Sequence, residues 1–165
     1  EYPQAIRLAG TGLDITQASS FVAGRKALLA GADEYAGKVE EQIVAMGGRK
    51  KLLAHCQSLR EGYVKAKELF TGMIPQVKRN AQQLDFWLEG LDLSILHVDF
   101  VMAMVQGTLA SQHDAFARRI VEGRQRTREL FAPTTNINGL EENLQVRYGF
   151  HEMYLEKLAA AVPAN

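Results

Sequence analysis

One long amphipathic segment, from about Gln82 to Ala110, restricts the fold more than any other feature of this sequence. Its apolar residues recur at alternating steps of four and three, which places them on one face of an α-helix. That face consists of Leu84, Leu88, Leu91, Ile95, Val98, Met102, Val105 and Leu109. A second apolar face consists of Phe86, Leu93, Leu96, Phe100 and Ala103. A helix with two apolar faces needs partners on both sides, so we expect it to be the most buried element of the chain.

Two segments upstream repeat with the same helical spacing. The first runs from Leu28 to Met46, with a capping-box start at Asp14 and Gln17 and an end at Gly47–Gly48. The second runs from Leu52 to Phe70 and is expected to stop at Thr71–Gly72, before Pro75.

Two further helices are expected downstream. One runs from Phe116 to Leu130 and closes at Ala132–Pro133. The last begins with a cap formed by Asn138 and Glu141, contains Leu140 to Leu158, and ends before Pro163. Six glycines fall inside the expected helices, where each costs about 1 kcal/mol relative to alanine, and they indicate close helix approach or a ligand against bare backbone. They are Gly24, Gly31, Gly62, Gly90, Gly107 and Gly149.

The sequence therefore predicts four long helices and a fifth short or broken one, with no alternating apolar and polar run typical of a β-strand. Short connections place consecutive helices antiparallel. We expect an all-α fold, an antiparallel up-and-down helical bundle in which residues 1–165 form a single domain. Because the chain begins with Glu1 rather than methionine, we expect it to be trimmed from a larger or processed chain.

Composition removes several classes of function. Lys plus Arg equals Asp plus Glu, at 19 each, so the chain lacks the positive field that nucleic-acid binding requires. The most apolar stretch, Leu93–Val105, is too short to span a membrane and contains His97 and Asp99. Cys56 is the only cysteine, so no intrachain disulfide forms.

The sequence lacks the motifs that are typical of metal and cofactor sites. No histidine follows an acidic residue by three positions, as a carboxylate-bridged dimetal site in a bundle requires, and no two histidines are four apart. A phosphate-binding loop and a nucleophile elbow are also missing from the sequence. We expect no metal site, no cofactor and no assembled catalytic set.

The central helix carries two polar candidates in its apolar part. His97 and Asp99 are two residues apart and point roughly 200° away from each other, so they cannot bind one ion together. A hydrogen-bonded core histidine and an interhelical aspartate are the simpler interpretation. The functional alternative brings His97, Asp99 and His151 together across neighbouring helices, where they would hold a small polar ligand.

Further candidates lie on the last helix and at the start of the central one. Arg147 and His151 share a helical face and could clamp a carboxylate, with Tyr148 donating a hydrogen bond. Surface ion pairs and edge packing are the simpler interpretation of that face. Trp87, the only tryptophan, packs at the edge of the core or presents an aromatic platform to a sugar-like ligand.

These observations favour a non-catalytic binding module, most specifically an extracytoplasmic ligand-sensing domain that recognises a small molecule or a partner protein. One alternative is a helical accessory domain of a larger secreted enzyme. Another is a small all-α enzyme with acid–base groups from the central and last helices. We also expect no nucleic-acid partner, no membrane insertion by this segment, and a homodimer formed through helix faces.

Overall fold

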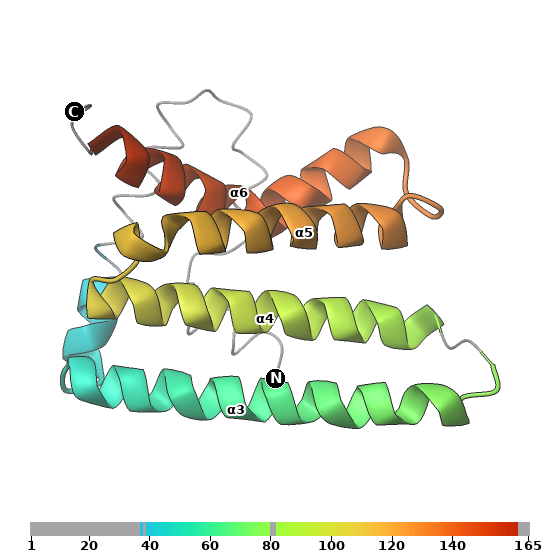
Figure 1. Cartoon of the computed structure of the whole chain (residues 1–165), viewed down its shortest axis with the longest axis horizontal. Coiled ribbons are helices and arrows are strands. Elements are labelled where there is room, and N and C mark those ends of the chain that lie inside the picture. The colour runs from blue at the N-terminus through green and yellow to red at the C-terminus, as the bar shows by residue number, and fades with distance from the viewer. Residues whose placement is uncertain (1–36, 38, 80–81, 162–165) are drawn as a thin grey trace.

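The computed structural model of this chain describes residues 37, 39–79 and 82–161 (Figure 1). The described part contains four long helices, joined by short connections that include two 3-10 turns, Ile74–Gln76 and Ala110–Gln112. The long helices are α3 (Arg49–Met73), α4 (Gln82–Gln106), α5 (His113–Phe131) and α6 (Ile137–Ala161). The end of an earlier helix covers 39–45.

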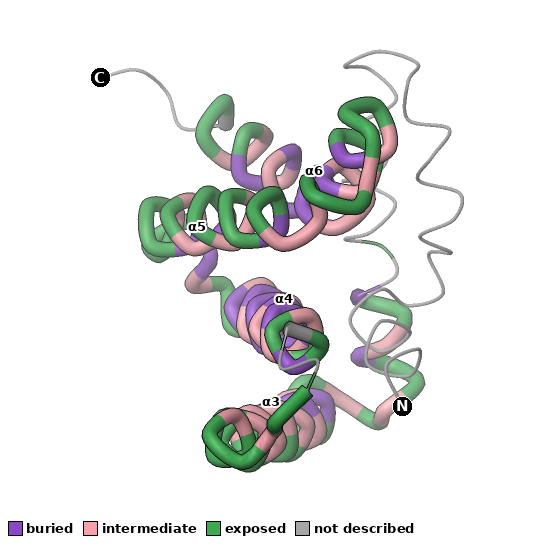
Figure 2. The backbone as a smooth tube through the Cα atoms, turned by 90° about the vertical axis from the view of Figure 1, so that its right-hand side faces the viewer, coloured by how far each residue is buried: buried purple, intermediate pink, exposed green. Residues whose placement is uncertain are grey.

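Successive long helices run in opposite directions, so the chain passes back and forth along one axis (Figure 1). Seen along that axis, α4 lies between α3 on one side and α5 with α6 on the other (Figure 2). The expected all-α, antiparallel up-and-down bundle is confirmed, and the described residues contain no strand.

The two apolar faces of α4 explain its central place. Val98, Val101 and Val105 pack in one buried cluster with residues of α3 and of 39–45. Leu96 and Phe100 belong to a second cluster, shared with α5 and α6. Since both faces are covered, α4 is buried nearly all round, as its sequence predicts. No described helix is both long enough and apolar enough to cross a membrane.

Glycines in the left-handed region end two of the helices. The helix over 39–45 ends at Gly47, with φ of 77°, and the amide of Gly48 donates to the carbonyl of Ile43 at 2.7 Å. In the same way α4 ends at Gly107, with φ of 71°, and the amide of Thr108 donates to the carbonyl of Ala103 at 2.9 Å. This is the Schellman arrangement, in which glycine adopts a conformation costly for other residues.

Three expected boundaries were therefore wrong. Helix α4 stops at Gln106 rather than Ala110, and Gly107 is a terminator rather than an interior glycine. Helix α3 continues through Thr71–Gly72 to Met73, since its backbone bonds persist until the 3-10 turn that holds Pro75. The cap of α6 is Asn136, whose side-chain oxygen accepts from the amide of Gly139 at 2.8 Å, and not Asn138. Some predictions concern residues outside the described part of the chain: Asp14, Gln17, Gly24, Gly31, Pro163 and the helix segment from Leu28 to Tyr35.

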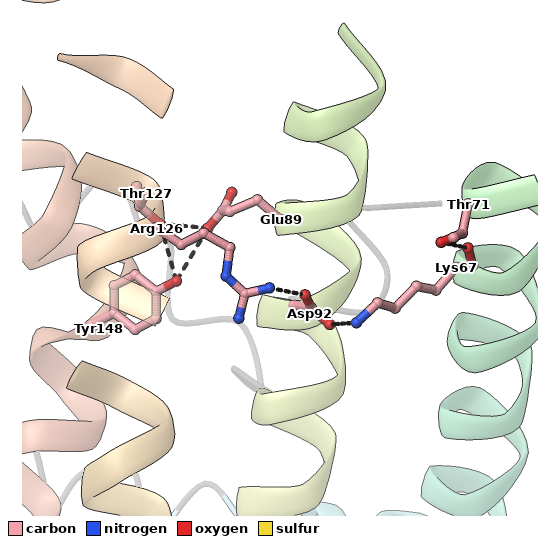
Figure 3. Close-up of polar contacts among 7 residues, drawn as sticks. All are labelled: Lys67, Thr71, Glu89, Asp92, Arg126, Thr127 and Tyr148. Carbon is pink, nitrogen blue, oxygen red and sulfur yellow. Dashed lines mark hydrogen bonds and ion pairs between the residues drawn. The ribbon is translucent and has the colours of Figure 1, made fainter. Parts of the chain in front are cut away.

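Two aspartates of α4 each join the helices on either side of it. Asp99 pairs with Arg60 of α3 at 2.7 Å and with Arg119 of α5 at 2.9 Å. Seven residues earlier, Asp92 pairs in the same way with a cation of each neighbouring helix, as Figure 3 shows, and these are Lys67 and Arg126. Because the spacing is seven residues on all three helices, the two bridges fix how far each helix is shifted along its neighbour.

Replacing Gly107 by alanine should lower the free energy of unfolding by about 1 kcal/mol, because a Cβ at positive φ is strained. The matched control is Gly62→Ala in the middle of α3, which should raise stability by up to about 1 kcal/mol through helix propensity. At both positions an added Cβ would meet no other atom within 4 Å, so the difference reports the backbone alone. Urea unfolding measures it, and equal effects of the two substitutions would contradict the assignment.

Candidate functional site

A carboxylate buried between three helices forms the polar centre of the molecule. Glu89 of α4 is only 3% exposed. Its Oε1 accepts hydrogen bonds from the hydroxyl of Thr127 at 2.6 Å and from that of Tyr148 at 3.1 Å (Figure 3). Its Oε2 accepts from a terminal nitrogen of Arg147 at 2.7 Å. A buried charge is tolerated only when it is paired and hydrogen-bonded, and here donors from α5 and α6 meet that requirement.

Tyr148 of α6 reaches Glu89 because α5 has a glycine, Gly123, at the point where α5 and α6 meet. A Cβ added at Gly123 would lie 2.8 Å from the ring and from the hydroxyl oxygen of Tyr148. Burial is the largest cause that raises the pKa of Tyr148 well above its usual range. The phenol therefore stays protonated at neutral pH and acts as a hydrogen-bond donor.

Arg147 connects this buried group to a pocket, which we call the aromatic pocket. The pocket has a volume of about 300 Å³ and is lined by Phe86, Trp87 and Gly90 of α4, Phe131 of α5 and Arg147 of α6. The guanidinium lies over the ring of Phe131 at 5.1 Å from its centroid, and Phe86 meets the same ring edge-on at 5.0 Å. Four of these five residues are aromatic or glycine, so the walls are mainly apolar.

Trp87 lies at the outer side of the aromatic pocket. It is 57% exposed, and its other contact is a stacked arrangement with Phe70 of α3 at 6.2 Å between ring centroids. It is therefore not a core anchor. An indole that stays largely in water beside an apolar hollow is the kind of surface that ligands cover.

A second cavity of about 180 Å³ lies between α4 and α5 and is lined partly by Glu89, Asp92, Arg119, Arg126 and Tyr148. Each of these charged groups already has a partner of opposite charge within the protein. Glu122 also lines this cavity, so its wall carries charges of both signs, whereas the aromatic pocket has a single charged residue, Arg147.

Two imidazoles meet inside the bundle. The rings of His97 on α4 and His151 on α6 lie 4.3 Å apart between centroids, and Phe100 meets His151 edge-on at 4.8 Å. His151 is 1% exposed, and neither of its ring nitrogens has a hydrogen-bond partner among the described residues. The pair thus lies among aromatic rings rather than against a carboxylate.

Both histidines are neutral at pH 7. Burial, followed by the positive charge of Arg147, lowers the pKa of His97 to about 4. Burial also lowers the pKa of His151 well below its usual value, and the positive charge of Arg119, with that of His97 when protonated, acts in the same direction. His97 is partly open to solvent, whereas protonating the fully buried His151 would place a charge in a core that cannot solvate it.

The structure distributes the six predicted site residues over four places. His97 and His151 contact each other, while Asp99 points instead to the arginines of α3 and α5. Arg147 and Tyr148 do bind a carboxylate together, but it is the internal one of Glu89. Trp87 lies at the aromatic pocket, which Arg147 also lines. Whether any of them binds a ligand remains a prediction.

Sequence reasoning missed Glu89 and Thr127, although both carried a signal. Glu89 lies four residues before Leu93 on the second apolar face of the central helix, where a charge is out of place. Thr127 continues the apolar stripe of α5, seven residues after Ile120. A polar residue on each of two buried stripes indicates an interhelical hydrogen bond.

Groups with metal-binding or nucleophilic potential are scattered in the described part of the chain. No three of its His, Cys, Asp and Glu side chains lie close enough together to hold a metal ion. Burial raises the pKa of Cys56, so this side chain packs as a neutral thiol in the cluster between α3 and α4.

Removing the buried carboxylate should be far more costly than removing an exposed one. Glu89→Ala leaves the charge of Arg147 and two hydroxyl donors without their acceptor, and the expected loss of unfolding free energy is about 3–5 kcal/mol. Asp85→Ala, in the exposed first turn of the same helix, should cost less than about 1 kcal/mol. Urea denaturation of both variants checks this, and similar losses would show that Glu89 is not the polar centre.

Acid should destabilise the protein through the histidine pair. Since their pKa values are lower in the folded than in the unfolded chain, the stability they contribute is complete above about pH 6.5 and falls as the pH drops toward 4. Each histidine contributes a slope of about 1.4 kcal/mol per pH unit in that window. His151→Leu should flatten the dependence of unfolding free energy on pH. An unchanged slope would contradict burial of a neutral imidazole at this position.

Comparison with protein-family models, with curated proteins and with solved structures finds no match to this chain. The structure itself places Arg147 both on the buried carboxylate of Glu89 and in the wall of the aromatic pocket.

Proposed function

We propose that this bundle is a binding module that takes up a small, ring-containing molecule in the aromatic pocket. The observation that carries the proposal is the position of Trp87, 57% exposed at the wall of a mainly apolar hollow. Ligand sites are concave, lined by apolar and aromatic groups, and fitted with a few polar ones that fix orientation. The aromatic pocket has this composition, with Arg147 as its charged group.

The size of the pocket limits the ligand. A volume of about 300 Å³ is at the lower end of the range for small-molecule sites, and it suits a molecule of one or two rings. Phe86, Trp87 and Phe131 present rings from two different helices, so a flat ligand can contact aromatic surface on more than one side. Gly90 lets such a ring approach the backbone of α4 closely.

A sensing role is supported by the way the pocket is connected to the core. The pocket is lined by α4, α5 and α6, and Arg147 also bonds Glu89, which ties the same three helices together. A ligand that moves Arg147 therefore acts on the packing of the bundle. Sensing outside the cytoplasm, recognition of a partner protein and dimerisation through helix faces stay predictions that rest on the sequence.

The catalytic alternative draws less support. Its acid–base candidates were His97, Asp99 and the face of Arg147 and His151. Asp99 is held by two arginines, the histidines contact each other, and of this set only Arg147 lines the aromatic pocket.

Trp87 makes binding directly measurable because it is the only tryptophan of the chain. Titration with p-cresol, with excitation selective for indole, should give a saturable change in emission, whereas an acyclic alcohol of similar size should give none. Gly90→Leu, at a buried position that lines the pocket, should weaken binding at least tenfold. Gly62→Leu on the exposed side of α3 is the matched control and should leave it unchanged.

Two outcomes would overturn the proposal. One is the lack of a saturable signal with ring compounds in the wild-type protein. The other is equal binding by the wild type and by Gly90→Leu, which would place the ligand elsewhere. Circular dichroism confirms that each variant keeps its helices.

A further inference from the structure

We infer that the ligand of the aromatic pocket carries a carboxylate, which Arg147 binds while it remains paired with Glu89. The ligand class is then a small aromatic carboxylate. This inference rests on the proposed function and deepens it, since it assigns the polar group of the ligand and the residue that selects it.

The first support is the charge of the pocket wall. Among the residues that line the aromatic pocket, Arg147 is the one charged side chain. Glu89 does not line it and opens instead on the second cavity, between α4 and α5. A ligand in the aromatic pocket therefore meets the cation of the pair and not its carboxylate. An anionic group is the polar group that suits such a wall.

The second support is that Arg147 has N–H donors that its bond to Glu89 does not use. A guanidinium carries five N–H groups in a planar fork, and one terminal nitrogen donates to Glu89 at 2.7 Å. Oε1 of Glu89 is occupied by the hydroxyls of Thr127 and Tyr148, so the ion pair is made through a single oxygen. The other edges of the fork can hold a second carboxylate through two parallel hydrogen bonds.

The third support is that Arg147 is already positioned. Its guanidinium is fixed by Glu89 at one side and by the face of Phe131 at another, and its side chain is 21% exposed. Folding therefore already holds the guanidinium in place, so that binding of a ligand carboxylate costs little further side-chain entropy. Partial burial also strengthens the interaction relative to one in water.

The aromatic and anionic parts of the ligand have neighbouring places. The ring would lie among Phe86, Trp87 and Phe131, and the carboxylate would face Arg147 on the same wall as Phe131. Phenylacetate has this combination in one small molecule. Phenylacetamide has the same shape without the charge, which makes the two a matched pair of probes.

The experiment compares the dissociation constants of phenylacetate and phenylacetamide, read from the emission of Trp87. In the wild-type protein the carboxylate should bind at least tenfold more tightly than the amide, and the difference should shrink as salt is added. Arg147→Gln should bring the two constants to the same value. Arg124→Gln, which removes a cation that pairs with Glu152 outside the pocket, should keep the wild-type ratio.

Arg147→Gln also leaves Glu89 without its cation and can fail to fold. Arg147→Lys then serves, because it keeps a positive charge for Glu89 but loses the planar fork, and it should lower the preference for the carboxylate while the amide binds as before. Equal binding of acid and amide by the wild type would overturn this inference and leave the pocket as a site for neutral rings. If neither compound gives a saturable signal and p-cresol gives none either, the proposed function itself is wrong.

Discussion

The burial of one carboxylate, that of Glu89, requires hydrogen-bond donors around it, and the packing of α5 and α6 against α4 supplies them. A charge at this depth is stable only with donors around it, and Thr127, Tyr148 and Arg147 supply them from α5 and α6. Tyr148 can reach the carboxylate only because Gly123 leaves α5 bare where the ring passes. The requirement of a single polar group thus fixes the position of two helices relative to α4.

Asp92 and Asp99, which pair α4 with its neighbouring helices, contribute less than Glu89 does. Asp92 and Asp99 are partly open to solvent, and such ion pairs contribute little to stability. Their value lies in register, because each bridges α3 and α5 at the same level. The apolar clusters on the two faces of α4 supply most of the free energy of folding, and the charges decide which alignment of the helices is used.

Local patterns in the sequence predicted the helices well, since apolar spacing and helix terminators depend on neighbours along the chain. Gly47 ends its helix as expected, whereas apolar spacing that continues past Gly107 to Leu109 wrongly predicts Gly107 as an interior residue. The sequence predicts that Arg147 and His151 clamp a carboxylate, with Tyr148 donating a hydrogen bond. Arg147 and Tyr148 do hold one, whereas His151 packs against His97 instead. That the carboxylate belongs to Glu89 depends on which helices meet, and single-helix periodicity carries no such information. The exposure of Trp87 is likewise a property of the assembled bundle.

Arg147 occupies the place where stability and the proposed binding meet. It neutralises Glu89 on one side and lines the aromatic pocket on the other, so the protein cannot change this residue for one purpose without affecting the other. On the proposed function, a ligand carboxylate would form a second pair with the guanidinium while the pair with Glu89 stays in place. The effect on helix packing can be no larger than the difference in ligand affinity between the arrangements of the bundle. On the proposed function, a small ligand of one or two rings would therefore act on this bundle only by binding one arrangement of α4, α5 and α6 more tightly than another.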